Sequence, residues 1–111
     1  MISIEKRDKI EIISFNVNKI DALISDDVRE RIRKLFDTSH SRVILDLKGV
    51  EYIDSSGFGC LLSILRDSRN SFGVLKLVNP EPRIMDLIQT LHLHTVFQIY
   101  DDMDACISAI R

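Results

Sequence analysis

A short turn in the middle of the chain carries the residues best suited to chemistry. The run Asp54-Ser55-Ser56-Gly57 joins an apolar stretch that ends at Ile53 to a helical pattern. The first N–H groups of a helix have no intrahelical acceptors, and the helix dipole makes this end electropositive. Both serine hydroxyls therefore lie where an oxygen, or a phosphate attached to it, is stabilised.

Two interpretations of these serines stay open on the residues alone. Ser55 can be the N-cap of the helix, a role worth about 1 kcal/mol relative to alanine. One serine can instead be a phosphorylation site, because a phosphate adds roughly −1.5 to −2 charges, which the helix end favours and an acidic partner repels. We expect Gly57 and Gly59 to keep the surface low, so that a partner's active site reaches the hydroxyl.

Most other site signatures are missing from the sequence. It contains no His-Glu-x-x-His, no Gly-x-Ser-x-Gly and no phosphate loop ending in Gly-Lys-Ser/Thr. His92 and His94 lie near a predicted helix end, where a cation is favoured, so we expect no metal site. A nucleotide hydrolase built on Asp54 or Ser55 would lack a catalytic base. The sequence thus predicts a protein that is not an enzyme and needs no cofactor.

Length, charge and cysteine content limit the class of protein further. The 111 residues suit one domain over 1–111, and the net charge of −2 argues against direct nucleic-acid binding. No apolar run is long enough for a membrane span, and the N-terminus has no signal-peptide pattern. We therefore expect no membrane insertion and a cytoplasmic location. Cys60 and Cys106 are far apart in sequence and are predicted to be buried free thiols.

The elements that must position the turn alternate between strand and helix, which predicts an α/β fold with a central mixed β-sheet of four to five strands and about four α-helices. The phase change of the apolar residues within 9–17 indicates either a bulge or a strand buried on both faces. The apolar run 42–47 is typical of a central strand covered on both sides. The expected strands are 2–4, 9–17, 42–47, 74–78 and 96–100, and the expected helices begin near 25, 56, 82 and 102.

Three local details of these helices follow from the pattern. Ser25-Asp26-Asp27 is predicted to cap the first helix, whose basic residues from Arg29 to Lys34 form a solvated face rather than a phosphate site. Gly73, after Phe72, is predicted to end the second helix in a left-handed conformation. The second helix should run from Ser56 to about Ser68, with a buried stripe of Phe58, Leu61, Leu62 and Leu65.

The stretch VILDLKGVEYIDSSGFGCLL, residues 43–62, resembles the signature of the anti-sigma factor antagonists of the STAS domain family. The resemblance extends over nearly the whole chain and implies a STAS-like fold. It also implies phosphorylation of Ser55, with Ser56 as the alternative, by an anti-sigma factor serine kinase of the histidine-kinase-like ATPase superfamily. The unphosphorylated form would bind that kinase and free a sigma factor for transcription, and a PP2C-type phosphatase would reset the switch. The implied partner-binding residues are Asp21, Asp54, Ser55, Ser56 and Gly57.

One loop departs from the family pattern of glycine, acidic residue, apolar residue and aspartate. The matching positions here are Asn18, Lys19, Ile20 and Asp21, so the aspartate is kept and the acidic residue becomes a lysine. We expect Asn18 to replace the glycine in a left-handed conformation. Because Lys19 reverses a charge on the implied docking surface, we expect the matching surface of the partner to differ from that of the family's kinases. The alternative function is a constitutive STAS interaction subunit of a transport or signalling complex, without a phosphorylation switch.

Overall fold

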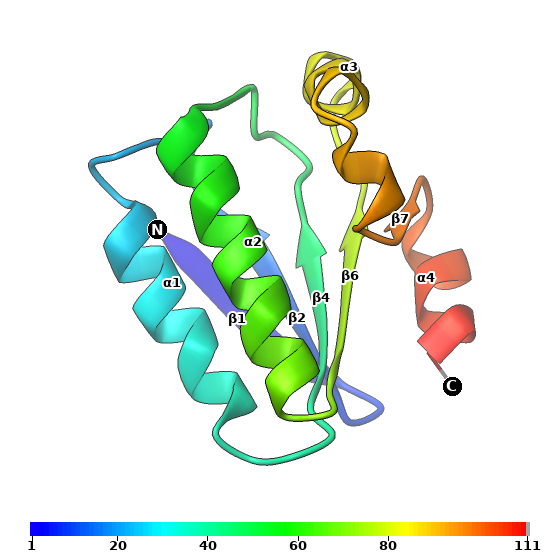
Figure 1. Ribbon diagram of the computed structural model, residues 1–111. Helices are drawn as coiled ribbons and strands as arrows, with labels where there is room; N and C mark the ends of the chain where they lie inside the picture. The colour runs from blue at the N-terminus through cyan, green and yellow to red at the C-terminus, as the bar shows by residue number, and fades with distance from the viewer. Residues whose placement is uncertain (111) are drawn as a thin grey trace.

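The computed structural model describes residues 1–110 and shows a mixed sheet with helices on both faces (Figure 1). The sheet has the strand order β1-β2-β4-β6-β7, in which β1 runs antiparallel to β2 and the remaining neighbours are parallel. Its strands are β1 (Ile2–Arg7), β2 (Ile10–Phe15), β4 (Arg42–Asp46), β6 (Val74–Val78) and β7 (Ile99–Tyr100). A separate parallel pair consists of β3 (Lys19–Ile20) and β5 (Tyr52–Ile53).

Four α-helices lie within the described residues and confirm the predicted α/β architecture. They are α1 (Ser25–Arg33), α2 (Ser55–Asn70), α3 (Pro82–Thr90) and α4 (Met103–Ile110), with 3-10 turns η1 (Lys34–Phe36) and η2 (Leu93–Thr95). The helices α1, α2 and α3 contribute to the larger core on one face of the sheet, and α4 covers part of the other face. The α2 helix begins at the end of the molecule where the parallel strands β4 and β6 have their carboxyl ends (Figure 1).

The central strands are buried on both faces, which resolves the phase change in the sequence. Ile13 and Phe15 of β2 pack in the core beneath α1 and α2, whereas Ile10 and Ile12 pack with Cys106 beneath α4. The register of β2 against β1 is uninterrupted from residue 10 to residue 15. Two apolar faces, rather than a bulge, therefore explain the shift in pattern.

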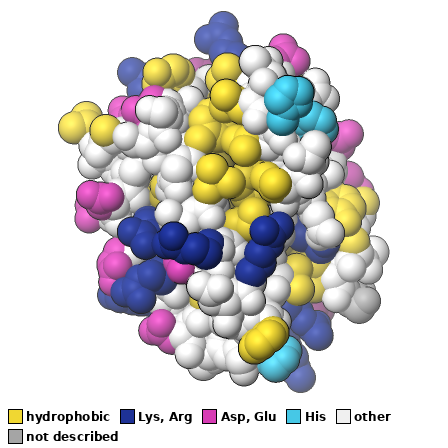
Figure 2. Space-filling model, viewed as in Figure 1, with side chains coloured by type: hydrophobic (Ala, Val, Ile, Leu, Met, Phe, Trp, Pro, Cys, Tyr) yellow, Lys and Arg dark blue, Asp and Glu magenta, His cyan; other side chains and the backbone are white. Residues whose placement is uncertain are grey.

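The buried stripe of α2 differs from the prediction at one position. Phe58, Leu61 and Leu65 are buried as expected, but Leu62 is 39% exposed and Ile64 is fully buried in its place. At about 100° per residue, the buried side chains of α2 centre on Leu61 and Ile64, and Leu62 lies at the edge of this stripe. Figure 2 shows apolar side chains gathered on this face of the molecule above a band of Lys and Arg side chains.

The turn after α2 also differs from the prediction. Phe72, not Gly73, adopts the left-handed conformation, with φ of 58°. Gly73 is required for a different reason, since a Cβ atom there would lie 2.7 Å from the carbonyl oxygen of Ser41. Close approach of two loops, rather than backbone handedness, thus explains the glycine.

Two further boundaries need correction. Ser25 does not cap α1, because Ile24 is the N-cap residue and the Ser25 hydroxyl donates instead to the Asp21 carbonyl oxygen at 2.6 Å. The last strand covers only 99–100, because the N–H groups of Val96 and Phe97 donate to the Leu93 carbonyl oxygen at 3.1 and 3.0 Å instead of to a neighbouring strand. Of the three aspartates at the expected start of the last helix, Asp101, Asp102 and Asp104, Asp102 is the one that caps it, because its Oδ2 accepts the Ala105 N–H at 3.1 Å.

Candidate functional site

The turn 54–57 is fixed by the carboxylate of Asp54. Asp54 is the N-cap residue of α2, and its Oδ1 accepts the N–H of Gly57 at 2.8 Å. Ser55 is the first residue of the helix, which excludes the first of the two interpretations, Ser55 as the N-cap. Asp54, one position earlier, caps the helix, so the Ser55 hydroxyl is not needed as a cap.

The same carboxylate connects α2 to the loop that carries Asp21. Asp54 Oδ2 accepts the N–H of Ala22 at 3.2 Å, and Asp21 Oδ1 accepts the N–H of Leu23 at 3.1 Å. The Asp21 carbonyl oxygen accepts from both the hydroxyl and the N–H of Ser25. The structure therefore brings together Asp21, Asp54 and the two serines, although about thirty positions separate the segments. Sequence reasoning missed Ala22, since a backbone donor leaves no signal in the residue type.

Ser55 and Ser56 present their hydroxyls to solvent. Both residues are exposed, and neither hydroxyl takes part in a hydrogen bond with the described residues. The Asp54 carboxylate and carbonyl oxygen accept the N–H groups of Gly57 and Phe58, so the N–H groups of the two serines remain at the positive end of the helix. The arrangement suits a hydroxyl that accepts an anionic group from outside.

Gly57 has a packing role, not the surface role that the sequence suggested. It is buried, and a Cβ atom there would lie 2.2 Å from the Ile20 carbonyl oxygen and 2.6 Å from Ile53 Cγ2. The glycine thus allows the first turn of α2 to rest on the β3–β5 pair. Gly59, by contrast, faces open space and keeps the surface low beside Ser56.

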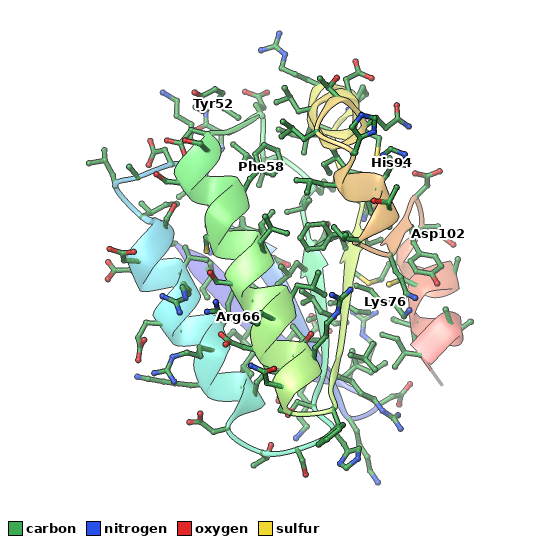
Figure 3. All side chains as sticks on the ribbon, in the orientation of Figure 1. Tyr52, Phe58, Arg66, Lys76, His94 and Asp102 are labelled. Carbon is green, nitrogen blue, oxygen red and sulfur yellow. The ribbon has the colours of Figure 1, made fainter. Side chains whose placement is uncertain are left out.

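The segment around Lys19 lies beside the turn as part of the β3–β5 pair. Lys19 is exposed and is in register with Tyr52, which Figure 3 labels near the start of α2. Asn18 is not left-handed, contrary to prediction. Its carbonyl oxygen instead accepts the N–H groups of Glu51 and Tyr52 at 2.8 and 3.1 Å, so Asn18 already belongs to the extended ladder.

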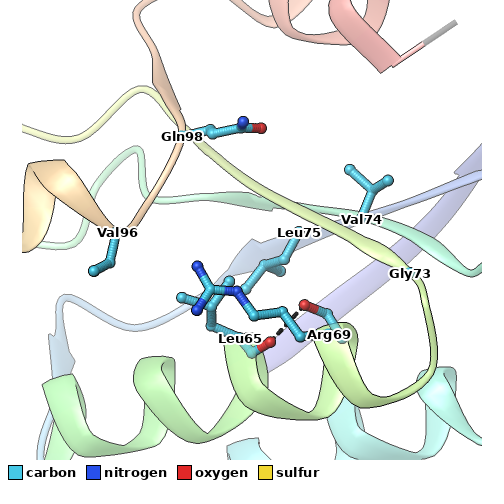
Figure 4. A pocket seen from close by; sticks show the side chains of 8 residues that line it. Leu65, Arg69, Gly73, Val74, Leu75, Val96 and Gln98 are labelled. Carbon is cyan, nitrogen blue, oxygen red and sulfur yellow. Dashed lines mark hydrogen bonds between the residues drawn. The ribbon is translucent and has the colours of Figure 1, made fainter.

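Grooves lie on both sides of α2. The groove toward α1 has a volume of about 470 Å³ and is lined by Ser56, Gly59, Cys60, Arg29 and neighbouring residues of both helices. The groove on the other side, toward β6 and the segment before β7, has a volume of about 200 Å³ and contains Leu65, Arg69 and Val96 (Figure 4). Only the first groove includes a residue of the 54–57 turn.

The two cysteines are buried free thiols, as predicted. Burial raises the pKa of Cys60 to about 11, while the Arg29 charge opposes this shift and the Asp26 charge adds to it. Burial likewise raises the pKa of Cys106 to about 11, with Lys76 opposing. Both thiols therefore stay protonated at neutral pH, which makes them poor nucleophiles and metal ligands.

Within residues 1–110, no group of three His, Cys, Asp or Glu side chains is arranged to hold a metal ion. His92 and His94 lie with their ring centroids 6.1 Å apart, next to η2 and away from the turn. None of the described helices is long and apolar enough to cross a membrane.

Comparison with known proteins places this geometry in a family. Residues 1–106 match the STAS domain, and the chain belongs to this family. A candidate anti-sigma factor antagonist of Thermotoga maritima is 28% identical over 72 residues, which cover 65% of this chain and 64% of that protein. The aligned part is thus less than two thirds of the relative's length.

Solved structures show the same fold at low sequence identity. An anti-sigma factor antagonist from Mycobacterium paratuberculosis superimposes with a TM-score of 0.87 at 22% identity, covering all of this chain and 93% of that one. The Bacillus protein SpoIIAA has TM-scores of 0.81 in its unphosphorylated form and 0.73 in its phosphorylated form, both at 20% identity. These matches cover all of this chain and 96% and 100% of the two SpoIIAA chains.

Proposed function

We propose that this chain is an anti-sigma factor antagonist that works by partner switching, with Ser55 as its phosphorylation site. The observation that carries the proposal is the exposed Ser55 hydroxyl, which makes no hydrogen bond within the described protein and lies on a turn that the Asp54 carboxylate fixes from both sides. The unphosphorylated protein binds an anti-sigma factor serine kinase and thereby releases a sigma factor. Phosphate on Ser55 ends that complex.

The electrostatics of the turn support such a switch. The N-terminus of α2 stabilises an added phosphate, so the modified state costs little within the domain itself. The same phosphate adds roughly −1.5 to −2 charges to a surface that already carries Asp21 and Asp54, so a kinase surface that fits these acidic side chains no longer fits. The kinase supplies the base and ATP, which is why the antagonist itself needs no cofactor and performs no catalysis.

The family relationship supports the remaining parts of the proposal. The Thermotoga relative is an anti-sigma factor antagonist by name, and SpoIIAA is known in both a phosphorylated and an unphosphorylated form. By analogy, a histidine-kinase-like ATPase modifies this chain in the cytoplasm and a PP2C-type phosphatase restores it. The implied docking surface is formed by Asp21, Asp54, Ser55 and Ser56, supported from beneath by Gly57.

Phosphate mapping tests the proposal directly. The protein is incubated with its cognate anti-sigma kinase and ATP, and the modified peptide is sequenced by mass spectrometry. We expect phosphate on Ser55, loss of that phosphate in Ser55→Ala, and retention in Ser63→Ala, a control serine farther along the same helix. Absence of phosphate from both turn serines, with a kinase shown to be active on another substrate, refutes the switch.

A constitutive interaction subunit is the second candidate, and the exposed Lys19 favours it. A positive charge beside the turn changes the surface that a family kinase would meet, while leaving the packing of α2 intact. In this case Ser55→Asp binds the natural partner as well as the native protein does, and the partner that co-purifies is a transport complex. In the switch model, Ser55→Asp binds at least tenfold more weakly, whereas Ser55→Ala binds normally.

A further inference from the structure

Arg29 differs from the other basic residues of α1. The sequence predicted that the residues from Arg29 to Lys34 form one solvated face, and Arg31 and Lys34 are indeed exposed. Arg33 forms an ion pair with Glu30 at 2.6 Å. The Nε atom of Arg29, however, is shielded from solvent and has no hydrogen-bond acceptor among the described residues. A buried N–H of a charged group without a partner is costly, so this Nε–H is a donor available to an acceptor that enters the groove.

The groove between α1 and α2 brings this arginine to the proposed phosphorylation turn. Its wall on α2 consists of Ser56, Gly59, Cys60 and Ser63, and its wall on α1 includes Arg29. Arg29 lines the same groove as Cys60, which lies one helical turn beyond Ser56, and its positive charge opposes the rise in the Cys60 pKa. Ser55 is not part of the groove.

We propose that Arg29 is the internal ligand of a phosphate carried by Ser56, and that it thereby distinguishes the two serines of the turn. The inference rests on the proposed function, in which this turn is phosphorylated, and it adds where the phosphate lies when it is attached to Ser56 or to Ser55. Phosphate on Ser56 turns into the groove and joins α1 to α2. Phosphate on Ser55 stays on the outer surface, where it meets the partner.

The chemistry of the two groups matches. Transfer of the γ-phosphoryl group of ATP forms the bond from phosphorus to the Ser56 Oγ, breaks the bond to ADP, and releases the hydroxyl proton to the kinase base or to solvent. The product carries three acceptor oxygens and close to two negative charges at neutral pH. A guanidinium offers several N–H donors in a planar fork that suits phosphate, and charge-assisted hydrogen bonds of this kind are about twice as strong as neutral ones.

The groove favours an attached phosphate over a free anion. Asp26 also lines it, and this carboxylate repels a negatively charged ligand that arrives from solution. A phosphate on Ser56 is already held at the rim, so its high effective concentration offsets that repulsion. The phosphate that Arg29 binds is therefore assigned to phosphoserine at position 56 and not to a soluble phosphate.

Site-specific incorporation of phosphoserine tests the inference without any kinase. The protein is made with phosphoserine at position 56 or at position 55, and the phosphorus NMR signal is titrated with pH. We expect the second pKa of the phosphate, near 6 in a free phosphoserine, to be about 0.5 to 1 lower at position 56 than at position 55. Arg29→Gln should abolish the difference, whereas Arg31→Gln, an exposed arginine on the same helix, should leave it unchanged.

Thermal unfolding provides a second readout. Arg29→Gln should lower the melting temperature more in the protein with phosphoserine at position 56 than in the unmodified protein, whereas with phosphoserine at position 55 its effect should equal that in the unmodified protein. Equal pKa values at the two positions, or no effect of Arg29→Gln, overturn the inference. The NMR signal of the Arg29 Nε–H provides a further control. If millimolar inorganic phosphate shifts this signal in the unmodified protein as far as phosphoserine at position 56 does, the inference is overturned in favour of a soluble ligand. Failure of the kinase to label the turn refutes the proposed function but leaves these measurements unaffected.

Discussion

The Asp54 carboxylate accepts the backbone N–H of Ala22 at 3.2 Å, across 32 positions of sequence. Its other oxygen accepts the N–H of Gly57 at 2.8 Å, so one side chain joins the start of α2 to the loop before α1. Asp54 therefore positions the serines that follow it and holds the neighbouring Asp21 loop in place. Both parts of the proposed docking surface depend on this residue.

Asp54→Ala should destabilise the protein by about 1–3 kcal/mol, because it removes a helix cap and a second hydrogen bond to the loop. Ser55→Ala should change the unfolding free energy by less than about 0.5 kcal/mol, since Ser55 is exposed and is not the cap. Urea unfolding of the two variants beside the native protein measures both values. A larger loss for Ser55→Ala than for Asp54→Ala would contradict the assignment of the cap.

The two glycines near the start of α2 should respond oppositely to alanine. Gly57→Ala places a Cβ atom 2.2 Å from the Ile20 carbonyl oxygen, and neither backbone can yield without moving α2 or β3. We expect a loss of about 2 kcal/mol or more, in the range of overpacked sites. Gly59→Ala meets open space within a helix and should stabilise by roughly 0.5–1 kcal/mol. Thermal unfolding of the pair provides the comparison.

Leu62 and Ile64 provide a test of which residues of α2 belong to the core. Ile64→Ala removes a fully buried side chain and should cost about 2–5 kcal/mol. Leu62→Ala truncates a side chain that is 39% exposed and should cost clearly less, about 1 kcal/mol or below. Chemical denaturation of the two variants settles the order. Equal losses would mean that Leu62 is covered in solution.

The buried thiols make stability sensitive to alkaline pH. Burial raises the pKa of Cys60 and of Cys106 to about 11, above the ordinary value of 9.0, so the folded protein keeps these protons longer than the unfolded chain does. Their contribution to stability is fully present below pH 9 and is lost as the pH rises from about 9 to 11. Urea unfolding at pH 8 and pH 10.5 should show a smaller fall for the Cys60→Ala/Cys106→Ala protein than for the native one. The comparison cancels the titration of lysines and tyrosines, which both proteins share.

The same thiols should react slowly with alkylating reagents in the native state. A thiol must be deprotonated to attack iodoacetamide, and both side chains are buried and protonated at pH 8. We expect labelling in urea to be at least tenfold faster than in native buffer, as followed by mass spectrometry. Rapid native labelling of Cys60 would show that the groove beside it opens in solution.

The alternation of strands and helices could be read from the sequence because each element carries its own periodic pattern. A run of apolar residues was enough to predict the central strand at 42–47, which the structure shows at 42–46. An aspartate before an apolar stripe was enough to predict the last helix, which Asp102 caps. The turn 54–57 was recognisable for the same reason, since helix starts favour short polar residues locally. Such features depend on a few neighbouring residues, so a single sequence contains them.

Side-chain roles that depend on distant segments could not be read in this way. Whether Asp54 or Ser55 caps α2 depended on a carboxylate that also reaches Ala22, and the need for Gly73 came from the Ser41 carbonyl oxygen in another loop. The exposure of Leu62 and the unpartnered Nε of Arg29 likewise follow from how α1 and α2 pack on the sheet. Sequence alone therefore determined the elements and the turn with its two hydroxyls. Only the tertiary structure decided which atoms surround them, because those contacts join residues that the local pattern keeps apart.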